Sequence, residues 1–175
     1  MRINILMLPS LIVMAAGCAS TVQKSDQSSP IPVSAEGTKS IVLNMTGSTD
    51  STTAKDWNDF KGLWREACTQ ESTTVGAVFA MQEGEPKPTG DVGTLVVVDV
   101  VDYHYISTGA RIMFGVMTGN AYINAKVTFR DLKSGDIRGS QAYDTKSSAW
   151  QGIFAGMTTK QVQAMCHEIV GQITR

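Results

Sequence analysis

The sequence predicts an α/β (α+β) domain, a two-layer sandwich in which two helices cover one face of a mixed sheet of about five strands. Three observations support this fold: two segments with apolar residues at helical spacing, several segments rich in β-branched apolar residues, and the order β-α-β-β-β-β-α. Helices and sheets that are apolar on one side bury those sides against each other. Four successive strands, and no glycine-rich fingerprint after the first strand, disfavour a doubly wound dinucleotide-binding fold.

The first half of the predicted domain contains a strand, a helix and a second strand. Residues 40–45 are apolar, rich in β-branched side chains and followed by Thr-Gly-Ser, which is typical of a strand that ends in a turn. In residues 54–71, approximately, apolar side chains recur every three or four residues and predict an amphipathic helix. Residues 75–81 are expected to form the second strand, and the Pro- and Gly-rich residues 84–90 a loop.

The second half is expected to supply three more strands. Residues 95–106 are almost continuously apolar, which predicts burial on both faces over part of their length. Residues 108–119 contain three glycines and indicate a loop or a bulged strand start. Residues 121–130 alternate apolar and polar side chains, as in a strand with one buried face. The Gly-containing residues 133–136 predict a tight hairpin, after which residues 137–145 return as the partner strand.

Each predicted helix is preceded by a capping-box pattern, Thr53 with Asp56 and Thr158 with Gln161, which can satisfy free N–H groups of the first turn. The terminal helix then has one apolar stripe, made of Val162, Met165, Cys166, Ile169, Val170 and Ile173. The first helix has a comparable stripe, made of Trp57, Phe60, Trp64 and Cys68. A single apolar stripe on each helix is what packing against one face of a sheet requires.

The N-terminal residues have the layout of a bacterial lipoprotein signal peptide, residues 1–17. One cation, Arg2, precedes an apolar segment that ends in Ala-Ala-Gly and then Cys18. Small residues before the cysteine suit a signal peptidase, and the thiol of Cys18 can accept a lipid. The alternatives are a non-lipidated secretory signal and a short transmembrane helix, although residues 3–17 are fewer than the roughly 20 that a spanning helix needs.

Residues 18–38 are polar, contain two prolines and almost no bulky apolar side chain, and are therefore expected to be a flexible, lipid-anchored tether. Residues 39–175 remain for a single domain that faces the periplasm. Several acyl chains at Cys18 would anchor the protein stably in the membrane, and Ala19, instead of the aspartate of an inner-membrane retention signal, points to the outer membrane. Without Arg2 the chain has 14 basic and 16 acidic residues, which gives no indication of nucleic-acid binding.

The sequence contains no recognisable catalytic set and no cofactor motif. The two histidines, His104 and His167, are far apart in the sequence and have no cysteines at zinc-binding spacing, so no metal site is predicted. A Gly-x-Ser-x-Gly elbow and a phosphate-binding loop are both missing from the sequence. The one plausible polar cluster is Asp99, Asp102, His104 and Arg111, and it leaves an enzyme or a small-ligand binder as the competing interpretation.

Alternation along the strand gives a more specific expectation for this polar cluster. Asp102 and His104 should lie on one face, and Tyr103 and Tyr105 on the other. By the same count, Asp99 shares the face of the tyrosines, where a solvated position is the simplest account of a carboxylate within an apolar strand.

Two cysteines remain besides Cys18. Cys68 lies on the stripe of the first helix and Cys166 on that of the last, so both are expected close to the sheet. In an oxidising periplasm they can form a disulfide that ties the two helices together. Two buried free thiols are the alternative, because cysteine is among the most buried residue types.

Two loop segments are unusually apolar. Residues 149–157 combine tryptophan, isoleucine, phenylalanine and methionine with two glycines, and residues 111–117 have a similar composition. Such loops either fold under the sheet or present a contact surface for a partner or a membrane. The residues predicted for partner contact are Arg111, Phe114, Trp150, Ile153 and Phe154.

Taken together, these features resemble the bacterial lipoproteins of the domain-of-unknown-function family numbered 4410. The likeness is carried by Cys18 and by residues 109–115, 129–135, 152–157 and 162–173. The family has no assigned reaction, so the resemblance implies a lipoprotein and no catalytic residue. The strand order is also similar to envelope lipoprotein domains that activate peptidoglycan synthases or build secretion channels, which is an analogy of fold.

The sequence therefore predicts an outer-membrane lipoprotein of the cell envelope that is not an enzyme and binds no cofactor. Its expected partners are the membrane, through lipid on Cys18, and an envelope protein with which it associates or assembles.

Overall fold

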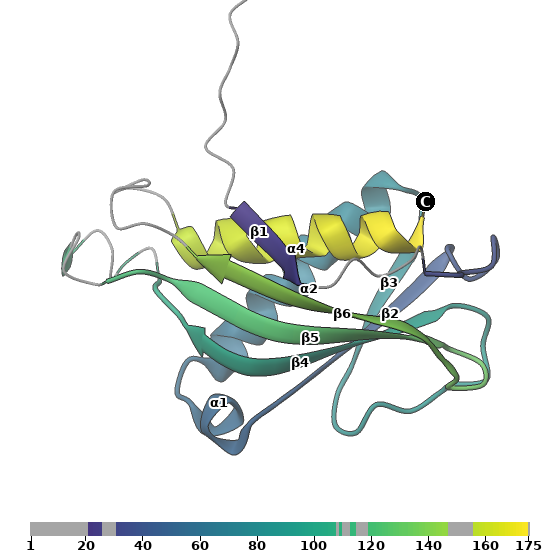
Figure 1. The fold of residues 1–175 in the computed structure, drawn as a ribbon, viewed down its shortest axis with the longest axis horizontal. Coiled ribbons are helices and arrows are strands. Elements are labelled where there is room, and N and C mark those ends of the chain that lie inside the picture. The colour runs from purple at the N-terminus through teal and green to yellow at the C-terminus, as the bar shows by residue number, and fades with distance from the viewer. Residues whose placement is uncertain are drawn as a thin grey trace, which may run out of the picture.

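The computed structural model describes residues 21–25, 31–107, 109, 113–114, 119–146 and 156–174. Within these ranges the chain forms a six-stranded mixed sheet and three helices, with α2 and α4 packed on one face of the sheet (Figure 1). The strand order is β1-β6-β5-β4-β2-β3. The predicted α+β sandwich is confirmed, and the sheet has one strand more than the sequence indicated.

Three parallel strands form one half of the sheet. β2 (Ser40–Gly47) lies between β3 (Val78–Gln82) and β4 (Thr94–His104), and it pairs parallel with both. Parallel neighbours need a crossover connection, and α2 (Trp57–Thr74) supplies the one between β2 and β3. The strand predicted at residues 75–81 therefore starts a few residues later than expected, because α2 continues to Thr74.

The antiparallel half of the sheet is a hairpin. β5 (Tyr122–Asp131) pairs with β4 on one side and with β6 (Ile137–Lys146) on the other. The turn uses Gly135 at a φ of 82°, a conformation that glycine adopts without a Cβ clash. The carboxylate of Asp131 accepts hydrogen bonds from the backbone N–H groups of Lys133 and Ser134, each at 3.0 Å. The predicted hairpin is present at the predicted place.

β1 (Thr21–Ser25) was not expected. It pairs antiparallel with β6, from Thr21 opposite Lys146 to Ser25 opposite Ala142, and forms one edge of the sheet. Farther along, Ile31 is 8% exposed and belongs to the hydrophobic core. Residues 21–25 and 31–38 therefore contribute to the fold, although the sequence analysis assigned them to a flexible tether. A polar strand can be held by main-chain hydrogen bonds to a sheet edge, which composition does not reveal.

The helices begin at other residues than the capping boxes predicted. A short helix, α1 (Thr49–Thr53), precedes α2 and is capped by Ser48, whose Oγ accepts a hydrogen bond from Ser51 N–H. α2 starts after Asp56, which makes no side-chain capping bond. α4 (Met157–Ile173) starts after Gly156.

The predicted capping residues of α4 instead connect the helix to the residues that follow β4 and to those that precede β5. Thr158 Oγ1 accepts a hydrogen bond from Ile106 N–H at 3.0 Å. The side-chain amide of Gln161 donates to the carbonyl oxygen of Ala121 at 2.9 Å. Both side chains are at most 1% exposed, so tertiary contacts have taken the place of the expected helix cap.

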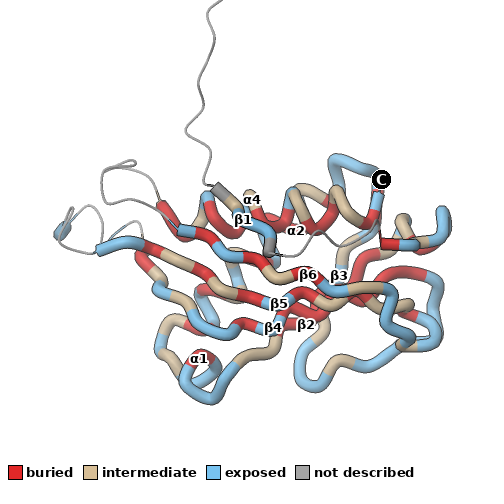
Figure 2. The backbone as a smooth tube through the Cα atoms, viewed as in Figure 1, coloured by how far each residue is buried: buried red, intermediate tan, exposed pale blue. Residues whose placement is uncertain are grey.

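The main core lies between the sheet and the two long helices, and Figure 2 shows buried positions along the inner strands and on the sides of α2 and α4. A smaller cluster, Val42, Leu95, Val97 and Leu132, is buried on the opposite face. Val96 and Val98 face the helices and are fully buried, so the start of β4 is covered on both sides as expected. The largest fully buried side chains are Trp64, Phe60, Phe129, Ile41, Leu43, Leu95, Ile123, Leu132, Met165, Ile169 and Ile173.

Candidate functional site

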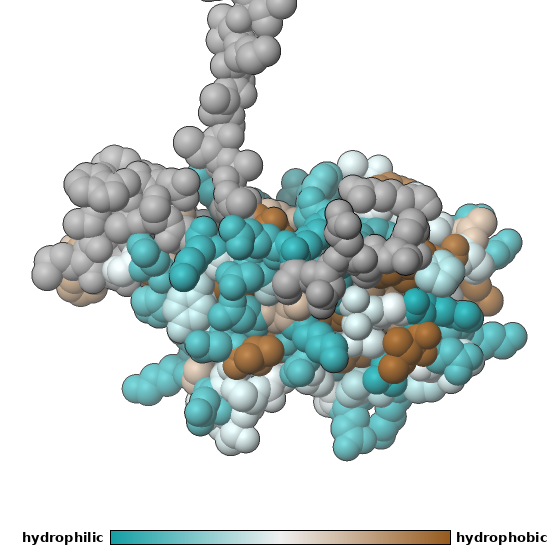
Figure 3. Space-filling model, in the orientation of Figure 1, coloured by the Kyte–Doolittle hydropathy of each residue, from teal (hydrophilic) through white to brown (hydrophobic). Residues whose placement is uncertain are grey.

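Most residues proposed for anchoring and contact lie outside the described part of the chain. This applies to Cys18, Arg111, Trp150, Ile153 and Phe154. Phe114 is described and is 61% exposed, beside Met113 at 77%. The face seen in Figure 3 is mainly hydrophilic, with separate apolar patches.

A disulfide joins the two long helices. Cys68 on α2 and Cys166 on α4 are bonded, with Cα atoms 5.1 Å apart, inside the 7 Å limit that a bridge can span. Both residues are at most 1% exposed. Their positions on the apolar stripes place them between the helices and the sheet, as the helical spacing predicted. The bridge connects residues 98 positions apart in the sequence, so it ties the helix after the first parallel strand to the C-terminal helix.

A groove with a volume of about 530 Å³ lies where β4 ends beside α1. β4 supplies one wall, including Asp102 and His104, and α1 with its flanking residues supplies the other. The lining residues are Ser48, Asp50, Ser51, Ala54, Asp56, Val101, Asp102, Tyr103, His104 and Tyr105. Sequence analysis identified the β4 wall but missed the α1 wall. The signal that could have revealed it is Ser48 before Thr-Asp, a pattern typical of a helix start.

A bulge in β4 decides which side chains enter this groove. The pairing with β5 shifts between Val100 and Asp102, which leaves Val101 60% exposed. The extra residue reverses the alternation. Asp99 therefore lies on the helix-free face of the sheet, where it accepts a hydrogen bond from Thr46 Oγ1 at 3.2 Å and pairs in register with Lys126. The prediction that Asp99 shares a face with the tyrosines was wrong, although its side chain is solvated as expected.

The proposed polar cluster is only partly assembled. Asp102 accepts a hydrogen bond from Tyr122 Oη at 3.0 Å, which raises the pKa of that phenol. His104 Nδ1 lies 2.9 Å from the carbonyl oxygen of Asn120, and the His104 ring lies 5.9 Å, centre to centre, from the ring of Tyr122. Asp99 does not line the groove, and Arg111 lies outside the described residues.

On the helix side of β4, Tyr103 anchors the groove to the core. Its ring stacks on Phe60 with the ring centres 4.4 Å apart, and its hydroxyl donates to Asp56 Oδ1 at 2.6 Å. Burial, followed by the hydrogen bond and the negative charge of Asp56, raises the pKa of Tyr103 well above the ordinary 10.0 of a phenol. Burial and the charges of Asp59 and Asp56 also raise the pKa of Tyr105. Neither phenol is thus adapted to exchange a proton near neutral pH.

These contacts link β4 to α1 and to the start of α2. Within the described ranges, no group of three or more His, Cys, Asp or Glu side chains is arranged to hold a metal ion. No helix within those ranges is long and apolar enough to span a bilayer. What the groove offers chemically is hydrogen-bond acceptors and aromatic surface, without a nucleophile and base in contact.

The comparisons with known proteins show a similarity of fold. No protein-family model and no curated protein matches the sequence. Among solved structures, the PelC dodecamer from Paraburkholderia phytofirmans aligns with a TM-score of 0.52 and 12% identity, over 89% of this chain and 97% of PelC.

Two further solved structures align more weakly. A Xanthomonas campestris protein of the unknown-function family 330 has a TM-score of 0.46 and 10% identity, over 76% of this chain and 81% of its own. A lipoprotein from Neisseria meningitidis has a TM-score of 0.33 and 13% identity, over 75% and 98%. Of these three alignments, the one with PelC shows that the chain shares its fold with that protein.

Proposed function

We propose that this protein is a lipid-anchored outer-membrane lipoprotein, related to the family of unknown function 4410, that serves as a non-enzymatic assembly component of the cell envelope. The signal-peptide pattern ending at Cys18 supports the anchor. The absence of a nucleophile–base contact in the described groove supports a binding role.

The observation that carries the proposal is the position of β1 directly after the lipidation site. β1 begins at Thr21, three residues beyond Cys18, and is paired with β6. Consecutive Cα atoms are about 3.8 Å apart, so the anchored cysteine lies within about 11 Å of the sheet edge. A flexible tether of about 20 residues would instead allow a reach of roughly 25 Å by random-coil scaling. The anchor therefore holds one corner of the domain close to the membrane.

An assembly role is also supported by the fold. The structure of PelC is that of a dodecamer, so a domain with this arrangement of strands and helices can build a multisubunit assembly. A domain held at the membrane by one corner loses rotational freedom, which lowers the entropic cost of association with further membrane-bound copies or partners.

Lipid attachment at Cys18 is tested by a substitution that removes only the thiol. We expect metabolic labelling with a palmitate analogue to mark the wild type, and Cys18→Ser to abolish the label and the processing of the signal peptide, because serine has no thiol to receive the lipid. Cys68→Ser is the matched control and should keep the label, since Cys68 is buried in the disulfide. Equal labelling of Cys18→Ser and wild type would refute the anchor, and recovery with the inner membrane would refute the outer-membrane location.

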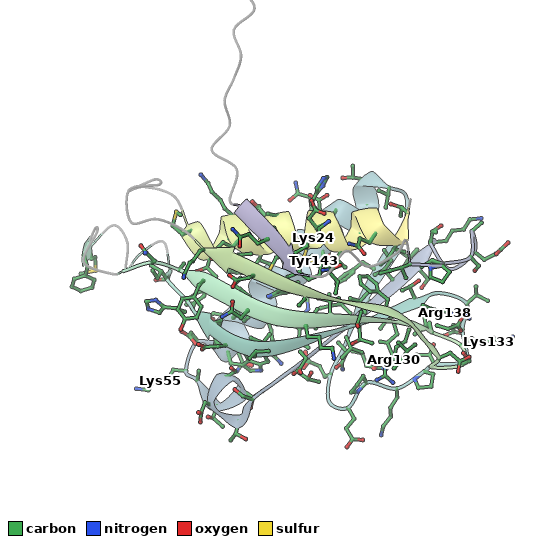
Figure 4. All side chains as sticks on the ribbon, viewed as in Figure 1. Lys24, Lys55, Arg130, Lys133, Arg138 and Tyr143 are labelled. Carbon is green, nitrogen blue, oxygen red and sulfur yellow. A yellow bond between two sulfur atoms is a disulfide. The ribbon has the colours of Figure 1, made fainter. Side chains whose placement is uncertain are left out.

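The partner is tested by photocrosslinking in intact cells from positions 150–154 in the predicted contact loop. We expect a discrete crosslinked species that contains an envelope protein or a second copy of this chain. A probe at exposed Lys55, on α1's side of the sheet, is the control position and should not produce the same species (Figure 4). Failure to obtain a discrete species from any position in the loop would contradict the proposed contact surface.

A further inference from the structure

A small pocket lies at the end of the sheet where β5 turns into β6. It has a volume of about 130 Å³ and contains two arginines. Figure 4 shows Arg130 and Arg138 at this end, with Lys133 beside them in the turn. The lining residues are Pro32, Val33, Ser34, Gly37, Gly93, Thr94, Arg130, Asp131 and Arg138.

The wall opposite the arginines is the segment before β2, which is fixed in place by three features. Ile31 is buried against Gly139, where an added Cβ would lie 3.3 Å from Ile31 Cγ1. Thr94, itself 2% exposed, donates its hydroxyl hydrogen to the carbonyl oxygen of Gly37 at 3.0 Å. Ser34 Oγ accepts a hydrogen bond from Gly37 N–H at 3.1 Å. The pocket is therefore formed by the folded chain, and does not depend on a loop that merely lies nearby.

The two arginines differ in how their charge is compensated. Arg138 donates to Asp131 Oδ2 at 2.8 Å, and this contact, with backbone N–H donors from the turn, lowers the pKa of Asp131 to about 2. Arg130 has neither an ion-pair partner nor a hydrogen-bond partner among the described residues, and its Nε is buried without an acceptor. The pocket thus contains two guanidinium groups and one carboxylate, so one positive charge remains.

A buried guanidinium nitrogen without an acceptor is costly and calls for a partner. Arginine presents its donors in a planar fork that matches the oxygens of phosphate and carboxylate groups. We propose that this pocket binds a small oxyanion of the size of phosphate, held by Arg130 and by the donors of Arg138 that do not face Asp131. The volume admits the charged group itself, with the remainder of a larger ligand outside.

The position of the pocket indicates where such an oxyanion comes from. Thr21, next to the anchor, pairs with Lys146 at the far end of β6, whereas Arg138 lies near the start of that strand. At about 3.4 Å per residue, the pocket is roughly 27 Å along the sheet from the anchored corner. A lipid headgroup would reach it only if the sheet lay along the membrane. We therefore assign the oxyanion to a ligand that is not part of the bilayer.

The test is a calorimetric titration of the full-length protein in detergent with inorganic phosphate at constant ionic strength. We expect saturable binding to the wild type and a dissociation constant about tenfold or more higher for Arg130→Ala, the change expected for the loss of one charge-assisted contact. Arg130→Lys keeps the charge and the stem but not the fork, so it should also weaken binding. This variant decides the case if Arg130→Ala does not fold.

Lys133→Ala is the matched control, because it removes one positive charge from the same turn without lining the pocket. We expect its dissociation constant to stay within about twofold of wild type, since the Lys133 side chain is exposed to solvent and does not line the pocket. Equal weakening by Arg130→Ala and Lys133→Ala, or no saturable phosphate binding by the wild type, would overturn the site. Binding that requires phosphatidylglycerol vesicles and is not seen with phosphate would overturn the assignment to a non-lipid ligand. The titration does not depend on lipid at Cys18, so its outcome is separate from that of the anchor.

Discussion

Replacing Cys68 and Cys166 together by alanine is expected to lower the free energy of unfolding by about 3–5 kcal/mol, the effect of a bridge that closes a loop of this length. The disulfide connects positions 98 residues apart and therefore restricts most of the unfolded domain. It also holds α2 against α4, which between them supply much of the main core. A loss of this size is a large part of the 5–15 kcal/mol that stabilises an ordinary domain.

Urea denaturation of the wild type and the double variant, each with and without a reducing agent, measures this contribution. Reduction should lower the midpoint of the wild type toward that of the variant and leave the variant unchanged. The four measurements separate the covalent bond from the packing of the side chains, because alanine removes both whereas reduction removes only the bond. A wild type whose midpoint is insensitive to complete reduction would show that the bridge does not stabilise the domain.

Hydrophobic periodicity predicted most of the fold because it reports burial directly. Residues 121–130 alternate strictly, and they form β5 with a shift of one residue. The stripe on residues 162–173 is buried along the length of α4. In both cases the apolar face of the element must be buried in the core, so the pattern and the structure agree.

β1 was missed because its pairing with β6 has no pattern in the sequence, although Val22 packs against the main core and Lys24 forms an ion pair with Glu168 of α4. Residues 21–25 have no apolar pattern, and their place in the sheet depends on the free edge of β6. Such an edge exists only once the hairpin has formed. Single-sequence reasoning therefore has no local signal for it, and it interpreted the segment as a tether.

The candidate sites were less predictable than the fold, for two physical reasons. The bulge after Val100 changes the face of the sheet on which every later residue of β4 lies. No residue type at that point predicts the bulge from the sequence. The proposed oxyanion pocket brings together Arg130 and Gly37, two positions that are distant in sequence and meet through the docking of Ile31 and the hydrogen bond from Thr94 to Gly37. Sites of this kind depend on tertiary contacts between segments.

Truncating Phe60 to alanine is expected to lower the free energy of unfolding by about 3–5 kcal/mol, the usual range for a fully buried phenylalanine. Its side chain is 0% exposed and lies at the centre of an aromatic cluster. The ring stacks on Tyr103 at 4.4 Å and meets Trp64 edge-on at 6.2 Å. Neighbours held by the disulfide and the sheet cannot collapse fully into the vacated space, which keeps the cost at the upper end of the range.

Phe114→Ala is the matched control, because it makes the same chemical change at a side chain that is 61% exposed. Thermal and urea unfolding should place this variant within about 0.5 kcal/mol of wild type, as expected for a surface substitution. The two variants should then separate stability from contact: Phe60→Ala weakens the domain, whereas Phe114→Ala leaves the domain intact and reduces crosslinking from positions 150–154. A destabilisation by Phe114→Ala comparable to that by Phe60→Ala would show that residue 114 belongs to the core and would remove it from the proposed contact surface.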